Sequence, residues 1–359
     1  MANVAFRSIT KQFGGFTAVN DVSFEIADGE FVCLLGPSGC GKTTTLRMIA
    51  GLEQPTSGRI FIGQDDVTEA KPKERDIGMV FQDYALFPHM TIADNIAYPL
   101  KVRGVGQAER HRRAAEVAKN LSIDQLLDRR PGQISGGQQQ RTSVARAVVH
   151  KPKVYLFDEP LSNLDAKLRL EARSFLKHLQ RELGVTSLYV THDQAEAMAM
   201  ADRVAVMDRG EIVQFGPPLE VYRQPATTFV ANFLGSPPMN LLSVRYTGGA
   251  FASGTLTLDA SPFAGRLRDV RDGSELTLGI RPEHVRMGGE DDRWRIPGEV
   301  YAVEPLGPEA LVTLRVAGAL VTARLFGDDP PTATGAASFA FDPAHLHVFG
   351  PDGRRLAAR

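Results

Sequence analysis

The stretch GPSGCGKT, Gly36 to Thr43, constrains the fold of this chain more than any other feature. It fits the pattern G-x-x-x-x-G-K-[ST], follows the apolar run EFVCLL and opens the helical run TTTLRMIAGL. Glycines let successive backbone N–H groups point inward, and the N-terminus of the following helix adds positive potential. A chance glycine turn would not match this context on both sides. The sequence therefore predicts a P-loop nucleotide-binding domain of the α/β class.

The residues of this loop have separable roles in such a site. Lys42 is expected to reach the β- and γ-phosphates, and Thr43 to coordinate Mg²⁺. The backbone of the loop is expected to surround the phosphates. The candidate nucleotide-binding residues here are Gly36, Pro37, Ser38, Gly39, Cys40, Gly41, Lys42, Thr43 and Thr44.

A second signal is VYLFDEP, Val154 to Pro160, in which an apolar run ends in two acidic residues. Asp158 can hold the Mg²⁺ shell of a P-loop site. Glu159 is placed to polarise a water against the γ-phosphate, which is the task of a general base. In a chain without a P-loop, two acids that only solvate a strand end would be the better interpretation.

Four further residues are weaker candidates when each is taken alone. Gln82 follows an apolar run and could contact metal or water, or lie on the surface. His192 ends the run TSLYVTHD, where it could contact the γ-phosphate or be structural. Phe13 could stack on adenine or belong to the core. Asp165 could contact nucleotide or only cap the helix that begins after it.

The chain is long enough for two domains, with 359 residues of which 43% are hydrophobic. The net charge of −1 gives no broad electrostatic surface for nucleic acid. Two cysteines, Cys33 and Cys40, favour a reducing compartment. The N-terminus lacks the apolar stretch of a signal peptide, and no run approaches the roughly 20 apolar residues of a membrane helix. We therefore expect a cytosolic protein that meets a membrane only through a partner.

The pattern of elements changes near Gly235. Before it, the apolar runs EFVCLLG, KVYLFDEP, TSLYVTHD and RVAVMDRG alternate with helical patterns, which is typical of buried parallel strands. A helical stretch covers residues 109–127. After GSPP, segments such as SGTLTLDA and SELTLGIRPEHV alternate in period two, which predicts a small all-β barrel or sandwich. The expected domains are 1–235, with a helical insertion about 88–153, and 236–359.

The stretch QISGGQQQR, Gln133 to Arg141, looks at first like a redundant second phosphate loop. Taken in order with GPSGCGKT, FQD, YLFDE, SNLD and TH, its ISGGQ resembles the signature of the nucleotide-binding subunit of ATP-binding-cassette (ABC) transporters. The resemblance covers essentially residues 1–235. It implies ATP and Mg²⁺ as cofactors and a head-to-tail dimer, expected here to be a homodimer, in which each signature faces the ATP of the other subunit.

The resemblance assigns roles to individual residues. Closure of the dimer would be driven by ATP, after which Glu159 activates water, His192 orients the γ-phosphate and Gln82 senses metal or water. Ser135 and Gly137 would donate to the γ-phosphate of the second subunit's ATP, with Gln138 nearby, and Gly136 and Asp165 are further candidate nucleotide-binding residues. Two positions depart from the family pattern: Ile134 stands where leucine is usual, and Phe13 where tyrosine is usual.

The family also implies partners. The segment DYALFPHMTIADNIAYPL, residues 83–100, would receive a short helix of a membrane subunit, and local core around the helical insertion is the less favoured alternative. Two membrane-spanning permease subunits and, indirectly, an extracytoplasmic solute-binding protein would complete the complex. The subunit would lie peripherally at the cytoplasmic face of the inner membrane.

The C-terminal segments GSPPMNLL, GIRPEHV, VEPLG and FDPAHLHVFGPDG resemble the OB/TOBE-like regulatory domain of importer ATPases. Within these, GSPPMN is most similar to the maltose, multiple-sugar and glycerol-phosphate branch. Polyamine, ferric iron, sulfate and phosphonate importers share the layout and remain alternatives. A soluble ABC ATPase acting on nucleic acid or ribosomes, and an exporter cassette, are less favoured.

Overall fold

The protein is described by a computed structural model that covers residues 2–327 and 334–357. The chain divides into two compact units, Met1–Leu219 and Glu220–Arg359. Met1 and residues 358–359, at the outer ends of the two predicted domains, lie outside the described residues. Within the described part of the chain, no helix is both long and apolar enough to cross a membrane.

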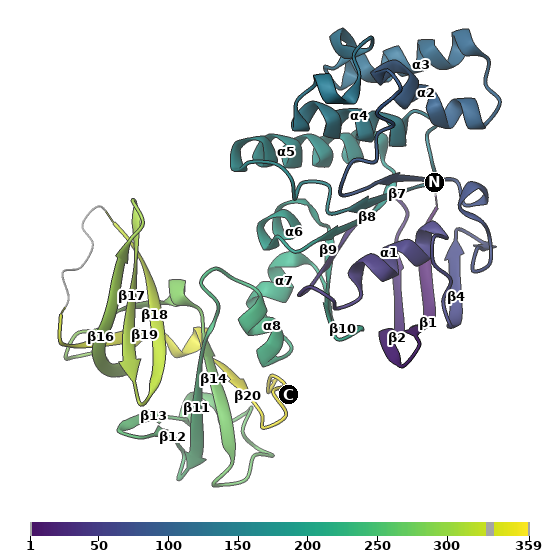
Figure 1. The fold of residues 1–359 in the computed structure, drawn as a ribbon. Coiled ribbons are helices and arrows are strands. Elements are labelled where there is room, and N and C mark those ends of the chain that lie inside the picture. Colours follow the sequence, from purple (N-terminus) through teal and green to yellow (C-terminus); the bar gives the residue numbers. More distant parts are fainter. Residues whose placement is uncertain (1, 328–333, 358–359) are drawn as a thin grey trace. The chain divides into compact units, whose positions relative to one another are not determined.

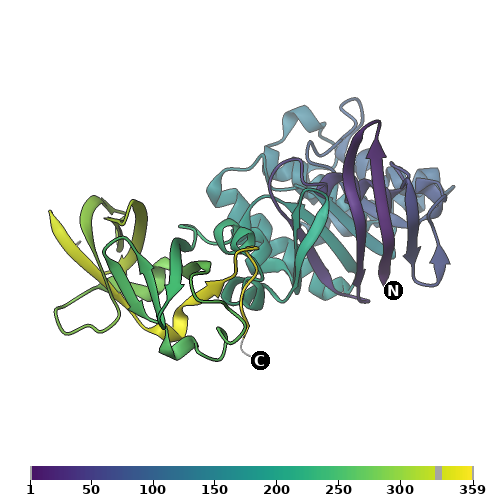
Figure 2. The ribbon, with the colours of Figure 1, turned by 90° about the horizontal axis from the view of Figure 1, so that it is seen from below.

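The first unit is built on two sheets (Figures 1 and 2). The six-stranded sheet has the order β10-β9-β3-β8-β7-β6, in which only β10 runs antiparallel to its neighbour. The four-stranded antiparallel sheet has the order β2-β1-β4-β5. The strands are β1 (Val4–Phe13), β2 (Phe16–Ile26), β3 (Phe31–Leu35), β4 (Ser57–Ile62), β5 (Asp65–Asp66), β6 (Ile77–Val80), β7 (Val154–Asp158), β8 (Thr186–Thr191), β9 (Arg203–Asp208) and β10 (Glu211–Gly216).

The four apolar runs predicted as parallel strands are confirmed as β3, β7, β8 and β9. Every residue of β3, β7 and β8 is buried, because these strands have neighbours on both faces. Helix α1 (Lys42–Ala50) packs between the two sheets, since its buried side chains share one core cluster with residues of both. The helix that begins at the P-loop is therefore held from two sides.

A group of three helices, α2 (Ile92–Val102), α3 (Gln107–Asn120) and α4 (Gly136–Val148), forms the helical subdomain within the predicted insertion 88–153 (Figure 1). The helix predicted over 109–127 is shorter in the structure. It ends at Asn120, and Ser122 then takes a left-handed backbone with φ 55°. The remaining helices are α5 (Ala166–Leu183), α6 (Gln194–Met200), α7 (Pro218–Arg223) and α8 (Thr228–Phe233).

The second unit consists mainly of two five-stranded antiparallel sheets with the orders β13-β12-β11-β14-β20 and β15-β19-β16-β17-β18. Buried side chains of both sheets form one core cluster, which confirms the predicted small all-β fold. The strands are β11 (Asn240–Thr247), β12 (Ala250–Ser253), β13 (Leu256–Asp259), β14 (Glu275–Ile280), β15 (Val285–Met287), β16 (Arg295–Pro305), β17 (Glu309–Val316), β18 (Ala319–Phe326), β19 (Ala336–Phe341) and β20 (His347–Phe349).

The segment 220–235 packs with this second unit, although the sequence places a domain boundary after it. The physical reason is Arg281, which follows β14 and is 2% exposed. Its guanidinium donates to the backbone carbonyls of Tyr222, Ala231 and Leu234. Helix α8 is thereby tied to the β-sheet, and the compact units divide before it.

In the first unit, a buried arginine performs a similar task at the end of the P-loop helix. Arg75 is 2% exposed and donates to the carbonyls of Met48 and Ile49 in the last turn of α1, at 2.6 and 2.8 Å. It also donates to the carbonyls of Thr68 and Ala70, at 3.1 and 2.8 Å. The arginine thus supplies a donor to the Ile49 carbonyl and a second donor to that of Met48, which also accepts from the N–H of Gly51 at 3.2 Å.

We predict that Arg75→Met lowers the free energy of unfolding of the first unit by at least about 3 kcal/mol, because several buried carbonyls each lose a donor at about 1–3 kcal/mol. Urea unfolding of the full chain, followed by hydrogen exchange in α1, would measure the change. Arg59→Met is the control, since Arg59 has a largely exposed side chain and only a 3.7 Å ion pair with Asp66. Equal stability losses in the two variants would contradict the role of Arg75.

Candidate nucleotide-binding and hydrolysis site

The loop between β3 and α1 requires glycine at its two ends. A Cβ atom on Gly36 would lie 2.3 Å from the carbonyl oxygen of Met207, and one on Gly41 would lie 2.5 Å from that of Ala18. Gly41 also has a φ of 106° and is the N-cap of α1. These glycines let the loop pack closely against the backbone at Ala18 and Met207. The N-terminus of α1 then faces the loop, as anion binding requires.

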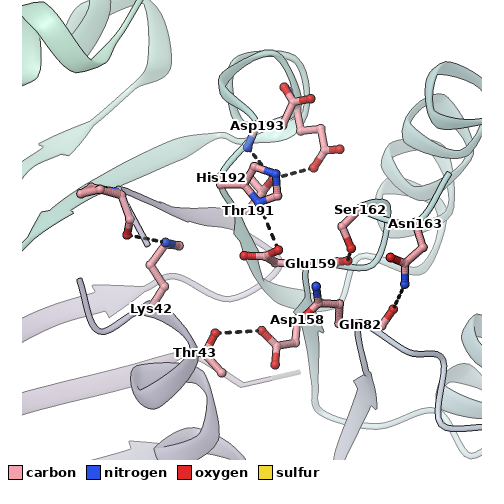
Figure 3. Close-up of polar contacts among 12 residues, drawn as sticks. Lys42, Thr43, Gln82, Asp158, Glu159, Ser162, Asn163, Thr191, His192 and Asp193 are labelled. Carbon is pink, nitrogen blue, oxygen red and sulfur yellow. Dashed lines mark hydrogen bonds and ion pairs between the residues drawn. The ribbon is translucent and has the colours of Figure 1, made fainter. Parts of the chain in front are cut away.

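Lys42 is folded into its own loop (Figure 3). Its Nζ atom donates to the carbonyls of Gly36 at 2.8 Å and Pro37 at 3.0 Å, and the residue is only 5% exposed. Cys40 beside it is buried, while Ser38 and Gly39 are exposed, and Thr44 is half-buried in the first turn of α1. The positive charge is therefore held inside the loop, where a phosphate group would exchange places with the two carbonyl contacts.

Thr43 and Asp158 meet across the site although they are far apart in sequence. The hydroxyl of Thr43 lies 3.2 Å from Oδ1 of Asp158, and Asp158 is 7% exposed. Burial raises the pKa of the Asp158 carboxyl above its ordinary value, and the hydrogen bond from Thr43 opposes this rise. A nearby positive ion would favour the charged carboxylate.

These two oxygen donors fit Mg²⁺, which is commonly bound by one or two protein groups together with water and phosphate oxygens. Among the described residues, no group of three or more His, Cys, Asp or Glu side chains is placed to hold a metal by itself.

Glu159 and His192 form the second pair of the site (Figure 3). Oε2 of Glu159 lies 3.1 Å from Nδ1 of His192. The backbone of Glu159 is left-handed with φ 45°, and its N–H donates to the carbonyl of Val190 on β8. The carboxylate is thus placed at the edge of the sheet, where β7 and β8 end side by side.

The strand end before His192 is fixed by a buried carboxyl that the sequence analysis did not identify. Glu196, 3% exposed, accepts hydrogen bonds from the hydroxyls of Tyr189 at 2.8 Å and Thr191 at 2.7 Å. Burial raises the pKa of Glu196. No local pattern in the sequence marked this residue, because its partners are set by the packing of α6 on β8.

Gln82 follows β6 and is exposed. Its backbone carbonyl accepts a hydrogen bond from the side chain of Asn163 at 3.0 Å. Asn163 lies in the stretch SNLD, for which the sequence analysis singled out only Asp165. The structure thus brings Lys42, Thr43, Gln82, Asp158, Glu159 and His192 to one region, as the close-up shows (Figure 3).

The other predicted residues are not bonded to this group. Ser135 is the N-cap of α4: it accepts from the N–H of Gln138 at 3.4 Å, and its own N–H donates to Oε1 of Gln138 at 2.9 Å. Ser135, Gly137 and Gln138 border a hollow of about 230 Å³ with residues of α5. Asp165 caps α5 through the N–H of Leu168 at 2.9 Å. No described hydrogen bond or ion pair joins these residues to the P-loop.

Phe13 lies at the turn between β1 and β2 and is 47% exposed. The ammonium group of Lys11 lies 4.7 Å from the centre of its ring. The ring is therefore not a core side chain, which leaves a face for stacking.

Comparison with known proteins identifies the family. The chain matches the ABC transporter family over residues 19–162, the MalK OB fold domain over residues 235–285 and the TOBE domain over residues 278–349. It is 50% identical to the trehalose/maltose import ATP-binding protein MalK of Thermococcus litoralis, covering 97% of this chain and 98% of that protein. It is 48% identical to the sn-glycerol-3-phosphate import ATP-binding protein UgpC of Cereibacter sphaeroides, covering 99% and 100%.

A further relative is the sulfoquinovosyl glycerol transport ATP-binding protein SmoE of Agrobacterium fabrum, at 46% identity over 97% of this chain and 98% of that protein. Among solved structures, the ATP-binding cassette MJ0796, in a dimeric post-hydrolysis state bound to ADP and Pi, matches with a TM-score of 0.55. It is 35% identical and covers 60% of this chain and 98% of that one. This chain belongs to the family of ATP-binding subunits of ABC importers and is an ATPase.

Proposed function

We propose that this ATPase drives the uptake of a sugar or related polyol, with Lys42, Thr43, Asp158, Glu159 and His192 as its hydrolysis site. The observation that carries the solute class is the similarity of 46–50% identity along nearly the whole chain, including the β-rich unit, to subunits named for trehalose/maltose, sulfoquinovosyl glycerol and sn-glycerol-3-phosphate import. These solutes are all rich in hydroxyl groups. An importer of another solute class is the alternative.

The mechanism follows from the geometry of the chain's own residues. Lys42 leaves its loop carbonyls to hold the terminal phosphates of ATP, and the loop N–H groups hold the others. Thr43 and Asp158 would hold Mg²⁺, whose charge would be available to neutralise that of the phosphate oxygens. Glu159 accepts a proton from the attacking water, while His192, 3.1 Å away, holds the Glu159 carboxylate and contacts the γ-phosphate.

The signature residues support a site completed by a second copy of the chain. Gly136 and Gly137 lie in the first turn of α4, yet neither has a positive φ, and a Cβ on either would meet only side chains at 3.7 Å or more. Glycine in a helix costs about 0.5–1 kcal/mol relative to alanine. The fold of one subunit does not require glycine here, whereas close approach of another molecule's phosphate would.

A groove in the first unit supports docking of a membrane subunit. It has a volume of about 630 Å³ and is lined by apolar side chains such as Ile77, Met79, Phe87, Tyr98 and Val102. Asp76 and Arg103, which form a 2.7 Å ion pair, lie among its polar lining residues. Phe87 and Tyr98 belong to the predicted docking segment 83–100. We infer that a short amphipathic helix of a permease binds here.

This arrangement defines the proposed complex. Two copies of this chain bind two membrane-spanning permease subunits at the cytoplasmic face of the inner membrane, and a solute-binding protein delivers cargo from the other side. Solute specificity then lies in those partners.

We predict that Glu159→Gln keeps ATP binding and slows hydrolysis by about 10²–10⁴-fold, because only the proton acceptor is lost. Phosphate release and fluorescent ATP-analogue binding would measure the two effects. Lys42→Ala is the contrasting variant and should lose nucleotide affinity. Normal turnover in Glu159→Gln would show that another group is the base.

We predict that Ser135→Arg leaves ATP binding to the monomer intact and abolishes ATP-driven dimerisation, because the long side chain fills the space for the second subunit's nucleotide. Size-exclusion chromatography with ATP, in the Glu159→Gln background, would measure dimer formation. Thr91→Arg, which replaces the N-cap of α2, controls for loss of a cap of about 1 kcal/mol. Dimers of Ser135→Arg as abundant as those of the control would contradict the assignment.

The solute proposal is tested by co-purifying the chain with its permeases and measuring ATP hydrolysis in lipid vesicles with the binding protein and single solutes. We expect stimulation by a sugar, polyol or phosphorylated polyol. Stimulation only by polyamine, ferric iron, sulfate or phosphonate would overturn the solute class and leave the ATPase assignment intact.

A further inference from the structure

Helix α4 holds the chain segment that follows Gln82. Its Ser143 hydroxyl donates to the carbonyl of Tyr84 at 3.0 Å. The guanidinium of Arg146 donates to the same carbonyl at 2.8 Å and to that of Ala85 at 2.6 Å. Three hydrogen bonds from one helix therefore converge on two consecutive carbonyls.

The backbone at these two carbonyls is in a conformation that needs such support. Tyr84 has φ 61° and Ala85 has φ 46°, and neither is glycine. A left-handed conformation costs a non-glycine residue roughly 1–2 kcal/mol. Strained backbone of this kind persists only where the surrounding structure holds it. The donors from α4 supply that restraint.

Among the described residues, Arg146 has no other hydrogen-bond partner. It is 8% exposed and lies 5.8 Å from the centre of the Phe87 ring. Burial lowers the pKa of Arg146, and the charge of Asp83 opposes this without a direct contact. The described groups that the guanidinium bonds directly are the two backbone carbonyls. An apolar side chain of similar length would fill the space but could not hold the carbonyls.

The other end of the segment is attached to the nucleotide-binding core. The carbonyl of Gln82 accepts from Asn163, five residues after Asp158 in the sequence, and Asn163 follows the sheet edge that carries Glu159. Residues 82–85 are thus held between the core and α4. Helix α4 also bears Ser135 at its N-cap, so Ser135 and Arg146 belong to one rigid element, on the order of 16 Å apart along the axis.

We propose that Arg146 is a positioning residue for hydrolysis: it fixes Gln82 relative to the helix that carries the signature residues. Arg146, Ala85 and Phe87 also line the groove described above, so a helix docked there contacts the restrained segment directly. The proposal rests on the role that the sequence predicts for Gln82, a contact with metal or water in the site, and adds a residue that lies outside the recognised motifs.

The test compares Arg146→Met and Ser143→Ala with the wild-type full chain. Loss of the guanidinium donors should lower kcat for ATP by about 10- to 100-fold, as misplacement by about 1 Å does, and leave KM within about twofold. Ser143→Ala removes one of three hydrogen bonds and should act in the same direction with a smaller effect. Arg146→Lys keeps the charge without the two-pronged geometry and should fall between wild type and Arg146→Met.

Hydrogen exchange provides a readout that does not depend on catalysis. The amides of Tyr84 and Phe87 are hydrogen-bonded in the structure, to the carbonyl of Phe81 and to the side chain of Asn95. In Arg146→Met, exchange in a peptide spanning 82–87 should speed up by about tenfold or more, while peptides of β7 and β8 keep their protection.

Arg281→Met is the matched control, because it also removes a buried arginine that donates to backbone carbonyls, but in the second unit. Its kcat, per folded chain, should equal that of wild type. Unchanged exchange at 82–87 in Arg146→Met, or loss of protection throughout the first unit, would overturn the proposal. If Gln82→Ala hydrolyses ATP at the normal rate, the predicted role of Gln82 is wrong, and with it the role of Arg146 in hydrolysis. Faster exchange at 82–87 in Arg146→Met would then still show that Arg146 restrains the segment.

Discussion

The position of β8 between β3 and β7 is the constraint on which the site depends. The register pairs Leu35 with Thr191 and Asp158 with Val190, so the three strands end together. Each strand leads into a different part of the site: β3 into the phosphate loop, β7 into the carboxylates of Asp158 and Glu159, and β8 into His192. Because the strands are closely packed on both faces, a shift in register would place every side chain against differently shaped neighbours, and the packing of the core therefore fixes the relative positions of the polar groups.

The same packing leaves one part of the chemistry incomplete. The P-loop, the carboxylates and His192 meet within one subunit, whereas the signature lies at the start of α4 with its polar groups used only for capping. A helix cap and a bound phosphate are both stabilised by the positive potential at the N-terminus of the helix. Ser135 caps its helix in the single subunit, and in the dimer proposed above it faces the nucleotide of the second copy. The fold of one chain does not require glycine at positions 136 and 137. The residue types Gly136 and Gly137 therefore fit the proposed phosphate contact rather than helix capping.

The sequence was sufficient for features that are local and periodic. The P-loop, the buried strands, the acidic pair and the change to a β-rich second unit follow from short patterns that require no knowledge of distant partners. The contact of Asn163 with Gln82, the bonds of Glu196 to the end of β8 and the attachment of 220–235 to the second unit were not predictable in this way. Each joins residues through a backbone or side-chain position that only the folded chain brings near.

Three buried arginines show why such contacts escape a sequence pattern. Arg75, Arg146 and Arg281 all donate to backbone carbonyls, and none forms an ion pair among the described residues. An arginine paired with a carboxylate has an acidic partner that can be looked for in the sequence. Every residue has a backbone carbonyl, so the carbonyl partners of these arginines cannot be recognised from residue types. Replacing such an arginine removes several donors from buried carbonyls at once. Buried arginines without acidic partners are therefore places where local structure, and in Arg146 the geometry of a reacting site, depends on one side chain.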